Sequence, residues 1–256
     1  MKKIILLLSV LLCSLFAKGQ DMKVIEEDLV VHLKKILYYR QTNNDSINQA
    51  NDKIMELLLY YTSKYPKTIN YKFSRLSKEG LEIATSDDTK FRIYSWDTFL
   101  GGTMQIWANV FQFNDDKVRS INSEESFTTS YDEHTSGAYS KIFTPDTNNN
   151  KIYLAYRSAR TDGHSAYDAI KLFKIENKRL NYTVKLIKTK SGITNTLGFD
   201  YDFTTAPEKN GEIDQLIFCE DKGKTIRFPV VNDNARVTNR WITYRFNGQY
   251  FEKVKK

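Results

Sequence analysis

The chain has 256 residues, of which 41% are hydrophobic, and its 38 Lys and Arg against 31 Asp and Glu give a formal net charge of +7 at pH 7. Basic and acidic residues are interleaved, without the continuous basic stripe that follows a phosphate backbone, which argues against nucleic acid as a partner. A chain of this length buries roughly 70% of the surface that its unfolded form exposes, so a hydrophobic core can stabilise it.

The first 19 residues have the three parts of a secretory signal peptide. Lys2 and Lys3 form a short basic region, residues 4–16 are apolar, and Ala17-Lys18-Gly19 places small residues on both sides of a lysine before Gln20. The apolar run is shorter than the roughly 20 residues that a membrane-spanning helix needs. We therefore expect residues 1–19 to be cleaved off, and the mature protein to be exported, periplasmic or secreted, without a transmembrane span.

The two cysteines predict no disulfide. Cys13 lies in the apolar run after two leucines, rather than after the small residues that lipoprotein processing prefers, and it is removed with the signal peptide. Cys219, at the end of the apolar run 216–219, is then the one cysteine of the mature chain. We expect its thiol to be buried and unreactive.

Two segments after the leader have helical periodicity. Between residues 21 and 40, apolar residues recur at steps of three and four, at positions 25, 29, 33, 36 and 37. Residues 46–64 repeat the pattern, and Pro66 forces Tyr65 out of helical geometry. Because residues 41–45 are polar and typical of a turn, residues 20–66 are predicted to form an antiparallel helical hairpin.

Residues 67–256 are predicted to form an antiparallel β domain. Short stretches of aromatic and β-branched residues alternate with clusters of Asn, Asp, Gly and Lys, and Asn247-Gly248 is a strong hairpin signal. The predicted strands are 81–85, 91–96, 103–113, 117–121, 152–157, 169–175, 182–187, 213–219, 225–229, 237–246 and 250–254, with a loop at 132–140. The fold class is therefore mainly β with an N-terminal helical hairpin, as an antiparallel meander that is either β-propeller-like or a β-sandwich.

Catalytic candidates are few. His134 and His164 lie in polar loops beside Asp132 and Asp162, and these residue types supply general acids and bases or zinc ligands. The chain has neither the HExxH motif of a zinc protease nor the GxSxG motif of a hydrolase elbow. We expect no metal or other cofactor, and keep His134, His164, Asp132 and Asp162 as candidate catalytic residues.

Exposed aromatic side chains are the other route to a binding site, because their flat faces can hold a sugar ring or an apolar side chain. Trp107 lies in a run that is apolar on both faces, so we expect it in the core. Trp96 precedes Asp97-Thr98 and Gly101-Gly102 at the end of a strand, and we predict that it is exposed and binds ligand.

The run SDDTKFRIYSWDTFLGGTM at residues 86–104, together with a leader that ends in Gly-Gln, resembles exported proteins of unassigned function from Bacteroidota. The similarity covers mainly residues 81–113, with a weaker counterpart at 240–253. It contains no catalytic residue. The resemblance implies an exported protein and says nothing about its reaction or ligand.

These features favour an exported, non-catalytic binding or interaction module of the cell envelope, whose ligand is a glycan, a peptide or an envelope protein. The alternative hypothesis is a secreted hydrolase with a loop site around His134 and His164.

Overall fold

A computed structural model describes the chain from Asp21 onward, with a few gaps. The described residues are 21–42, 45–122, 137–145, 147, 151–209, 212–213 and 215–255. The predicted signal peptide at residues 1–19 lies outside them and stays a prediction. Across the described part of the chain, no helix combines the length and the apolar character that crossing a membrane requires.

The predicted helical hairpin is confirmed. Helix α2 (Met22–Gln41) begins where the Asp21 carboxylate accepts a hydrogen bond from the Lys23 N–H at 3.0 Å. Helix α3 (Ile47–Lys64) runs back beside it and ends before Pro66, where Tyr65 is extended. A 3-10 turn, η1 (Pro66–Ile69), and the short helix α4 (Ser74–Lys78) connect the hairpin to the strands.

Three sheets follow, in which every strand pair but one is antiparallel. The first sheet has the order β1 (Glu82–Thr85), β2 (Phe91–Asp97), β3 (Trp107–Asn114), β4 (Val118–Asn122). The middle sheet has the order β11 (Thr196–Asp202), β7 (Ser165–Glu176), β6 (Ile152–Arg160), β5 (Ala138–Phe143), and β8 (Arg179–Asn181) also pairs with β7.

The last sheet has the order β10 (Ile193–Thr194), β9 (Ile187–Lys188), β17 (Phe251–Lys253), β16 (Val237–Phe246), β15 (Thr225–Val231), β14 (Phe218–Glu220). Its β9–β17 pair is parallel. A two-stranded hairpin, β12 (Glu208–Lys209) and β13 (Glu212–Ile213), and the 3-10 turns η3 (Phe203–Thr205) and η4 (Asp221–Gly223) complete the described elements.

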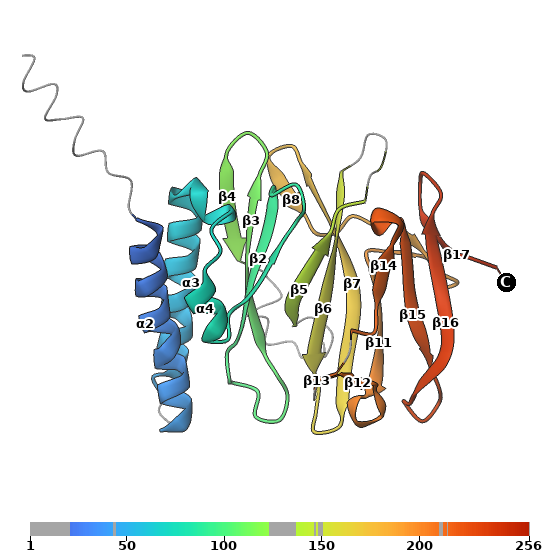
Figure 1. The fold of residues 1–256 in the computed structure, drawn as a ribbon, viewed down its shortest axis with the longest axis horizontal. Coiled ribbons are helices and arrows are strands. Elements are labelled where there is room, and N and C mark those ends of the chain that lie inside the picture. The colour runs from blue at the N-terminus through green and yellow to red at the C-terminus, as the bar shows by residue number, and fades with distance from the viewer. Residues whose placement is uncertain are drawn as a thin grey trace, which may run out of the picture.

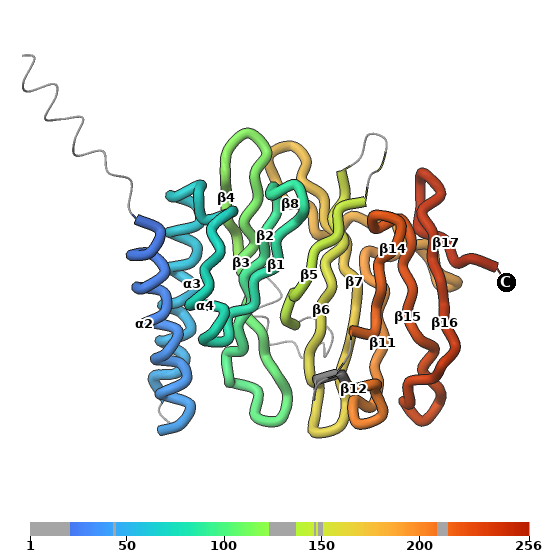
Figure 2. Tube along the Cα trace, viewed as in Figure 1, coloured from blue at the N-terminus to red at the C-terminus, as the bar shows by residue number. Residues whose placement is uncertain are grey.

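The helices and the three sheets stack face to face in a row, with the helical layer at one end and the last sheet at the other (Figure 1). Figure 2 shows the path of the chain through these layers. After β7 and β8 of the middle sheet, the chain contributes β9 and β10 to the last sheet and then returns to the middle sheet as β11. Each contact between layers has its own apolar core: Tyr94 and Trp96 of β2 pack on the helices, whereas Phe91 and Ile93 of the same strand pack on the middle sheet. The mainly β class with a helical hairpin is thus confirmed, in a face-to-face arrangement of open sheets that is compatible with a β-sandwich.

Two of the strands in the middle sheet were missed. Residues 138–143 form β5, although the predicted loop extended to residue 140, and β11 was missed although Leu197, Phe199 and Tyr201 alternate with polar residues and glycine as in a half-buried strand. The opposite error occurs at 182–187, where Val184 and Leu186 pack on the last core without strand pairing and only Ile187 enters a strand. Burial alone therefore does not distinguish a strand from a packed loop.

The strand predicted at 103–113 begins at Trp107 instead. Gly102 has a φ of +63°, and a Cβ at Gly101 would lie 2.1 Å from the Met104 carbonyl oxygen. The two glycines therefore form a tight turn that delays the strand. In the run 213–219, β13 ends at Ile213 and β14 begins only at Phe218.

Candidate functional site

His164 and Asp162 lie together in the exposed turn between β6 and β7. One Asp162 carboxylate oxygen accepts hydrogen bonds from the backbone N–H groups of His164, at 2.7 Å, and Ser165, at 2.6 Å. These bonds lower the pKa of Asp162, with the His164 bond as the larger cause. Asp162 thus serves as a turn-forming residue.

His134 and Asp132 lie outside the described residues, so whether all four candidate residues converge is untested. In the part of the chain that the structure describes, no group of three or more His, Cys, Asp and Glu side chains is placed to hold a metal ion.

The prediction that Trp96 is exposed is wrong. Its side chain is only 1% exposed, and its indole N–H donates to the Asn51 side-chain oxygen at 2.9 Å. The error came from the polar residues that follow it, which form the next loop, whereas Trp96 itself lies on the face of β2 that the helices cover. Trp107, predicted to be buried, is the partly exposed tryptophan of the two, because it is the first residue of β3.

A buried acid lies in the middle sheet. Asp168 is 1% exposed and accepts hydrogen bonds from the hydroxyls of Tyr156, at 2.5 Å, and Tyr201, at 3.3 Å. Burial raises the pKa of Asp168 to about 6. Since Tyr156 and Tyr201 are buried as well, we interpret this cluster as part of the core.

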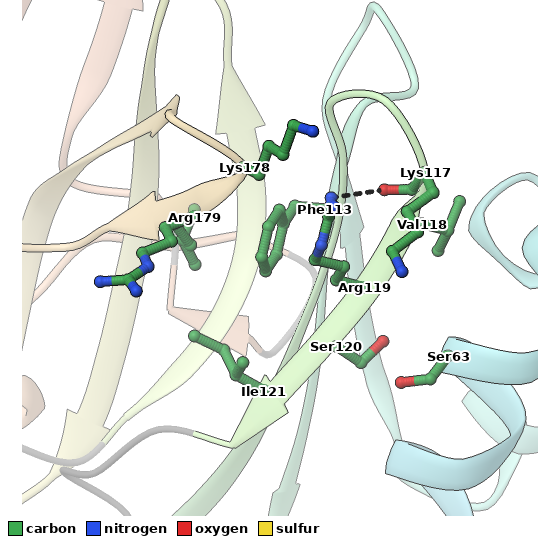
Figure 3. A pocket seen from close by; sticks show the side chains of 10 residues that line it. Ser63, Phe113, Lys117, Val118, Arg119, Ser120, Ile121, Lys178 and Arg179 are labelled. Carbon is green, nitrogen blue, oxygen red and sulfur yellow. Dashed lines mark hydrogen bonds between the residues drawn. The ribbon is translucent and has the colours of Figure 1, made fainter.

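The described surface has a groove of about 690 Å³ between β4, an edge strand of the first sheet, and β8, on the edge of the middle sheet (Figure 3). It combines four basic side chains with an apolar floor. The lining residues are Ser63, Phe113, Lys117, Val118, Arg119, Ser120, Ile121, Lys178, Arg179 and Leu180.

The groove follows the edge of β4 rather than one face of it. Five consecutive residues, 117–121, line it, although alternate side chains of a strand point to opposite faces. Figure 3 shows Ile121 directed toward the β8 side and Ser120 directed toward Ser63 of α3. Phe113 and Leu180, both buried, form apolar parts of the floor.

An ion-pair network joins the two hairpin turns at the mouth of the groove. The Asp116 carboxylate pairs with Arg119 at 2.7 Å and with the Lys178 ammonium at 3.0 Å, and the Lys178 backbone N–H donates to Asp115 at 3.1 Å. Hydrogen bonds from Lys178 and then Arg119 hold the pKa of Asp116 well below its usual range. The network therefore fixes the position of β8 relative to β4.

The turn between β7 and β8 is strained where it contributes to the groove. Glu176 pairs with Arg179, so Asn177 and Lys178 form a two-residue hairpin loop, and both have positive φ, of 51° and 63°. Turns of this type favour glycine in the second place, because a non-glycine residue there costs about 1–2 kcal/mol. Here a lysine holds that place, and its N–H and ammonium both reach the first sheet.

Two of the four cations are available to a ligand. Among the described residues, the side chains of Lys117 and Arg179 have neither an ion pair nor a hydrogen bond. Asp115 and Asp116 offset two of the four positive charges around the groove, which leaves a local net charge of 4 − 2 = +2. The groove is thus suited to an anionic ligand.

The predicted strands end at residues 113 and 175, so the sequence indicates a turn after each of them but not the site that the two turns form. Residues 114–117 and 176–179 each follow a predicted strand and each combine acidic with basic residues. This mixture of charges was the one local sign that the two turns could form ion pairs. The turns are about 60 residues apart in the chain, and only the stacking of two sheets brings them together. No family model, curated protein or solved structure matches this chain.

Proposed function

We propose that this protein is an exported, non-catalytic binding module of the cell envelope that holds an acidic, extended peptide segment of another protein in the groove between β4 and β8. The observation that carries the proposal is an edge of β4 that no other described strand covers, flanked by Lys117 and Arg179, two cations without partners in the same part of the chain.

The edge of β4 supplies the means of binding. Among the described strands, β4 pairs with β3 alone, on one side, and its other edge borders the groove. An extended peptide binds such an edge by adding a strand to the sheet, with main-chain hydrogen bonds giving affinity and side-chain pockets giving specificity. Free strand edges also pair nonspecifically, and charges beside them limit this.

The side chains along the groove define the ligand sequence. Lys117 and Arg179 favour carboxylates, whereas Phe113, Ile121 and Leu180 offer apolar contact. Because successive residues of an added strand point to opposite sides, the best ligand alternates acidic and apolar residues. The ion-pair network through Asp116 holds β4 and β8 in place before the peptide binds, which lowers the entropic cost of binding.

The test measures fluorescence anisotropy of a labelled eight-residue peptide of alternating Glu and Val. The double variant K117E/R179E should weaken binding by at least tenfold, since two partly exposed ion pairs contribute about 0.5–1 kcal/mol each and charge reversal adds repulsion. The control K185E/K190E changes charge equally at exposed lysines outside the groove and should bind like the wild type.

Two further peptides test the mode of binding. The Lys-Val analogue should not bind, and N-methylation of alternate backbone amides of the Glu-Val peptide should abolish binding, because it removes the main-chain donors. Equal affinity for the N-methylated peptide would contradict strand addition. Equal loss in K117E/R179E and K185E/K190E, or binding of polyphosphate in place of the peptide, would contradict the proposed ligand. Export is tested by mass spectrometry of the extracytoplasmic protein, which should begin at Gln20.

A further inference from the structure

Helix α2 carries an apolar stripe on its solvent side. Val24, Val31 and Tyr38 are 52%, 50% and 60% exposed, which is unusual for large apolar side chains that recur on one helix. They are seven residues apart, so they drift by only about 20° per step and form a nearly straight line about 21 Å long. We call these three residues the α2 stripe.

The α2 stripe points away from the rest of the molecule. The core-facing side of α2 is formed by Ile25, Leu29, Leu33 and Ile36, which are buried in the apolar core that α2 shares with α3, α4 and β2. At 100° per residue, the α2 stripe lies on the opposite side of the helix. Figure 1 shows α2 as the outermost element at the end of the stack, so this side faces solvent.

Charges flank the α2 stripe in an ordered way. Glu27 and Lys34 lie along one side of it, and Asp28 and Lys35 lie along the other. On both sides the carboxylate precedes Val31 and the ammonium follows it. The pattern is therefore acidic in the first half of the helix and basic in the second, with Val31 at its centre.

We propose that a second copy of this chain packs its α2 antiparallel on the α2 stripe, with a two-fold axis at Val31. This symmetry places Val24 of one copy opposite Tyr38 of the other. On one flank Glu27 faces Lys34 of the second copy, and on the other Asp28 faces Lys35. Every charge along the contact then meets an opposite charge, in an isologous interface.

The same pattern excludes the parallel arrangement, because that would place each carboxylate beside its own equivalent. Three of the charges also have partners within the chain. Lys34 contacts Glu79 at 3.0 Å, Glu27 lies 3.5 Å from Arg75, and Asp28 accepts a hydrogen bond from the Tyr61 hydroxyl at 2.7 Å and lies 3.5 Å from His32. The side chains of Lys34, Glu27 and Asp28 are 57%, 65% and 36% exposed, so each can still reach a second copy. A single pair of helices buries less than the roughly 800 Å² per partner of a standard interface, so the dimer is weak and reversible.

The test is sedimentation velocity of the mature protein over a concentration series from 1 μM to 1 mM, which spans the range expected for a contact of this size. The wild type should shift from monomer toward dimer. V31K, which places two ammonium groups at the two-fold axis, should raise the dimer dissociation constant at least tenfold. V254K is the matched control, since Val254 is 40% exposed and lies in the C-terminal segment after β17.

Charge exchange distinguishes this interface from any other. E27K and K34E should each weaken the dimer, because each creates like charges across the contact, and the double variant E27K/K34E should restore it. D233K, at an exposed turn of the last sheet, should dimerise like the wild type. A monomer at all concentrations, a dimer unaffected by V31K, or a failure of the double variant to recover would overturn the proposal. A monomer that floats with anionic lipid vesicles would also overturn it, and would assign the α2 stripe to a lipid surface. None of these outcomes bears on the peptide groove, which this inference does not use.

Discussion

Asn51 joins the helical hairpin to the first sheet through buried hydrogen bonds, and its replacement by alanine should be strongly destabilising. The side chain is 2% exposed. Its amide nitrogen donates to the carbonyl oxygens of Thr98, at 3.0 Å, and Ile47, at 2.9 Å, and its oxygen accepts from the Trp96 indole at 2.9 Å. The Asn51→Ala variant loses all three bonds.

The magnitude follows from what remains buried. The Trp96 N–H is left without its acceptor, which costs about 1–3 kcal/mol, and loss of the bond to Thr98 costs about 1 kcal/mol. The bond to Ile47 lies within the helix and contributes little, because that carbonyl belongs to the helical ladder. We expect the free energy of unfolding to fall by about 2–4 kcal/mol, which lowers the melting temperature by roughly 4–16 °C in a chain of this size.

Urea denaturation followed by far-UV circular dichroism measures this change without relying on tryptophan fluorescence. A double-mutant cycle with Trp96→Phe, which removes the indole donor, should give a coupling energy of about 1–3 kcal/mol between the two positions. A loss of less than about 0.5 kcal/mol in Asn51→Ala, or additive effects in the cycle, would refute the structural role of Trp96 and reopen its assignment to a ligand.

Three other measurements check the titrating groups and the strained turn. Burial raises the pKa of Asp168 to about 6, so the folded state retains its proton more strongly than the unfolded state, and the stability of the wild type relative to Asp168→Asn should fall by about 2–3 kcal/mol as the pH rises from 4 to 7; an equal difference at both pH values would contradict this. Cys219, predicted to be buried, is partly exposed, but burial still raises the pKa of its thiol to about 12, so a thiol reagent should label the native protein at least about 100-fold more slowly than the urea-unfolded protein, and similar rates would contradict this. Lys178→Gly relieves a positive φ but loses the ion pair to Asp116, so its stability should stay within about 1 kcal/mol of the wild type while its affinity for the acidic peptide falls. Lys222→Gly relieves a similar φ of 55° outside the groove and should keep full affinity, so equal binding by the two variants would exclude a role for Lys178.

Local patterns predicted the elements best where one face of an element is buried and its ends are marked. The period of α2 and the stop at Pro66 gave the helical hairpin, and the aromatic and β-branched stretch 237–246 gave the bounds of β16 without error. The edge strand β11 was missed although its apolar residues alternate, and Trp96 was misplaced because its polar neighbours conceal its burial. In both places the environment comes from elements distant in the chain.

The sequence by itself determined the class of the protein: a helical hairpin and then antiparallel strands, because the periods of 3.6 and 2 residues depend only on which side of each element avoids water. Which sheets stack on each other depends on contacts between segments far apart in the chain. Such contacts produce no regular spacing of apolar residues within either segment. Only the tertiary structure therefore places the turn at Asp116 beside the turn at Lys178, 62 residues later, and so forms the groove. The same holds for the α2 stripe, since Val24, Val31 and Tyr38 can be recognised as exposed only once the remaining layers have been shown to pack on the opposite side of the helix.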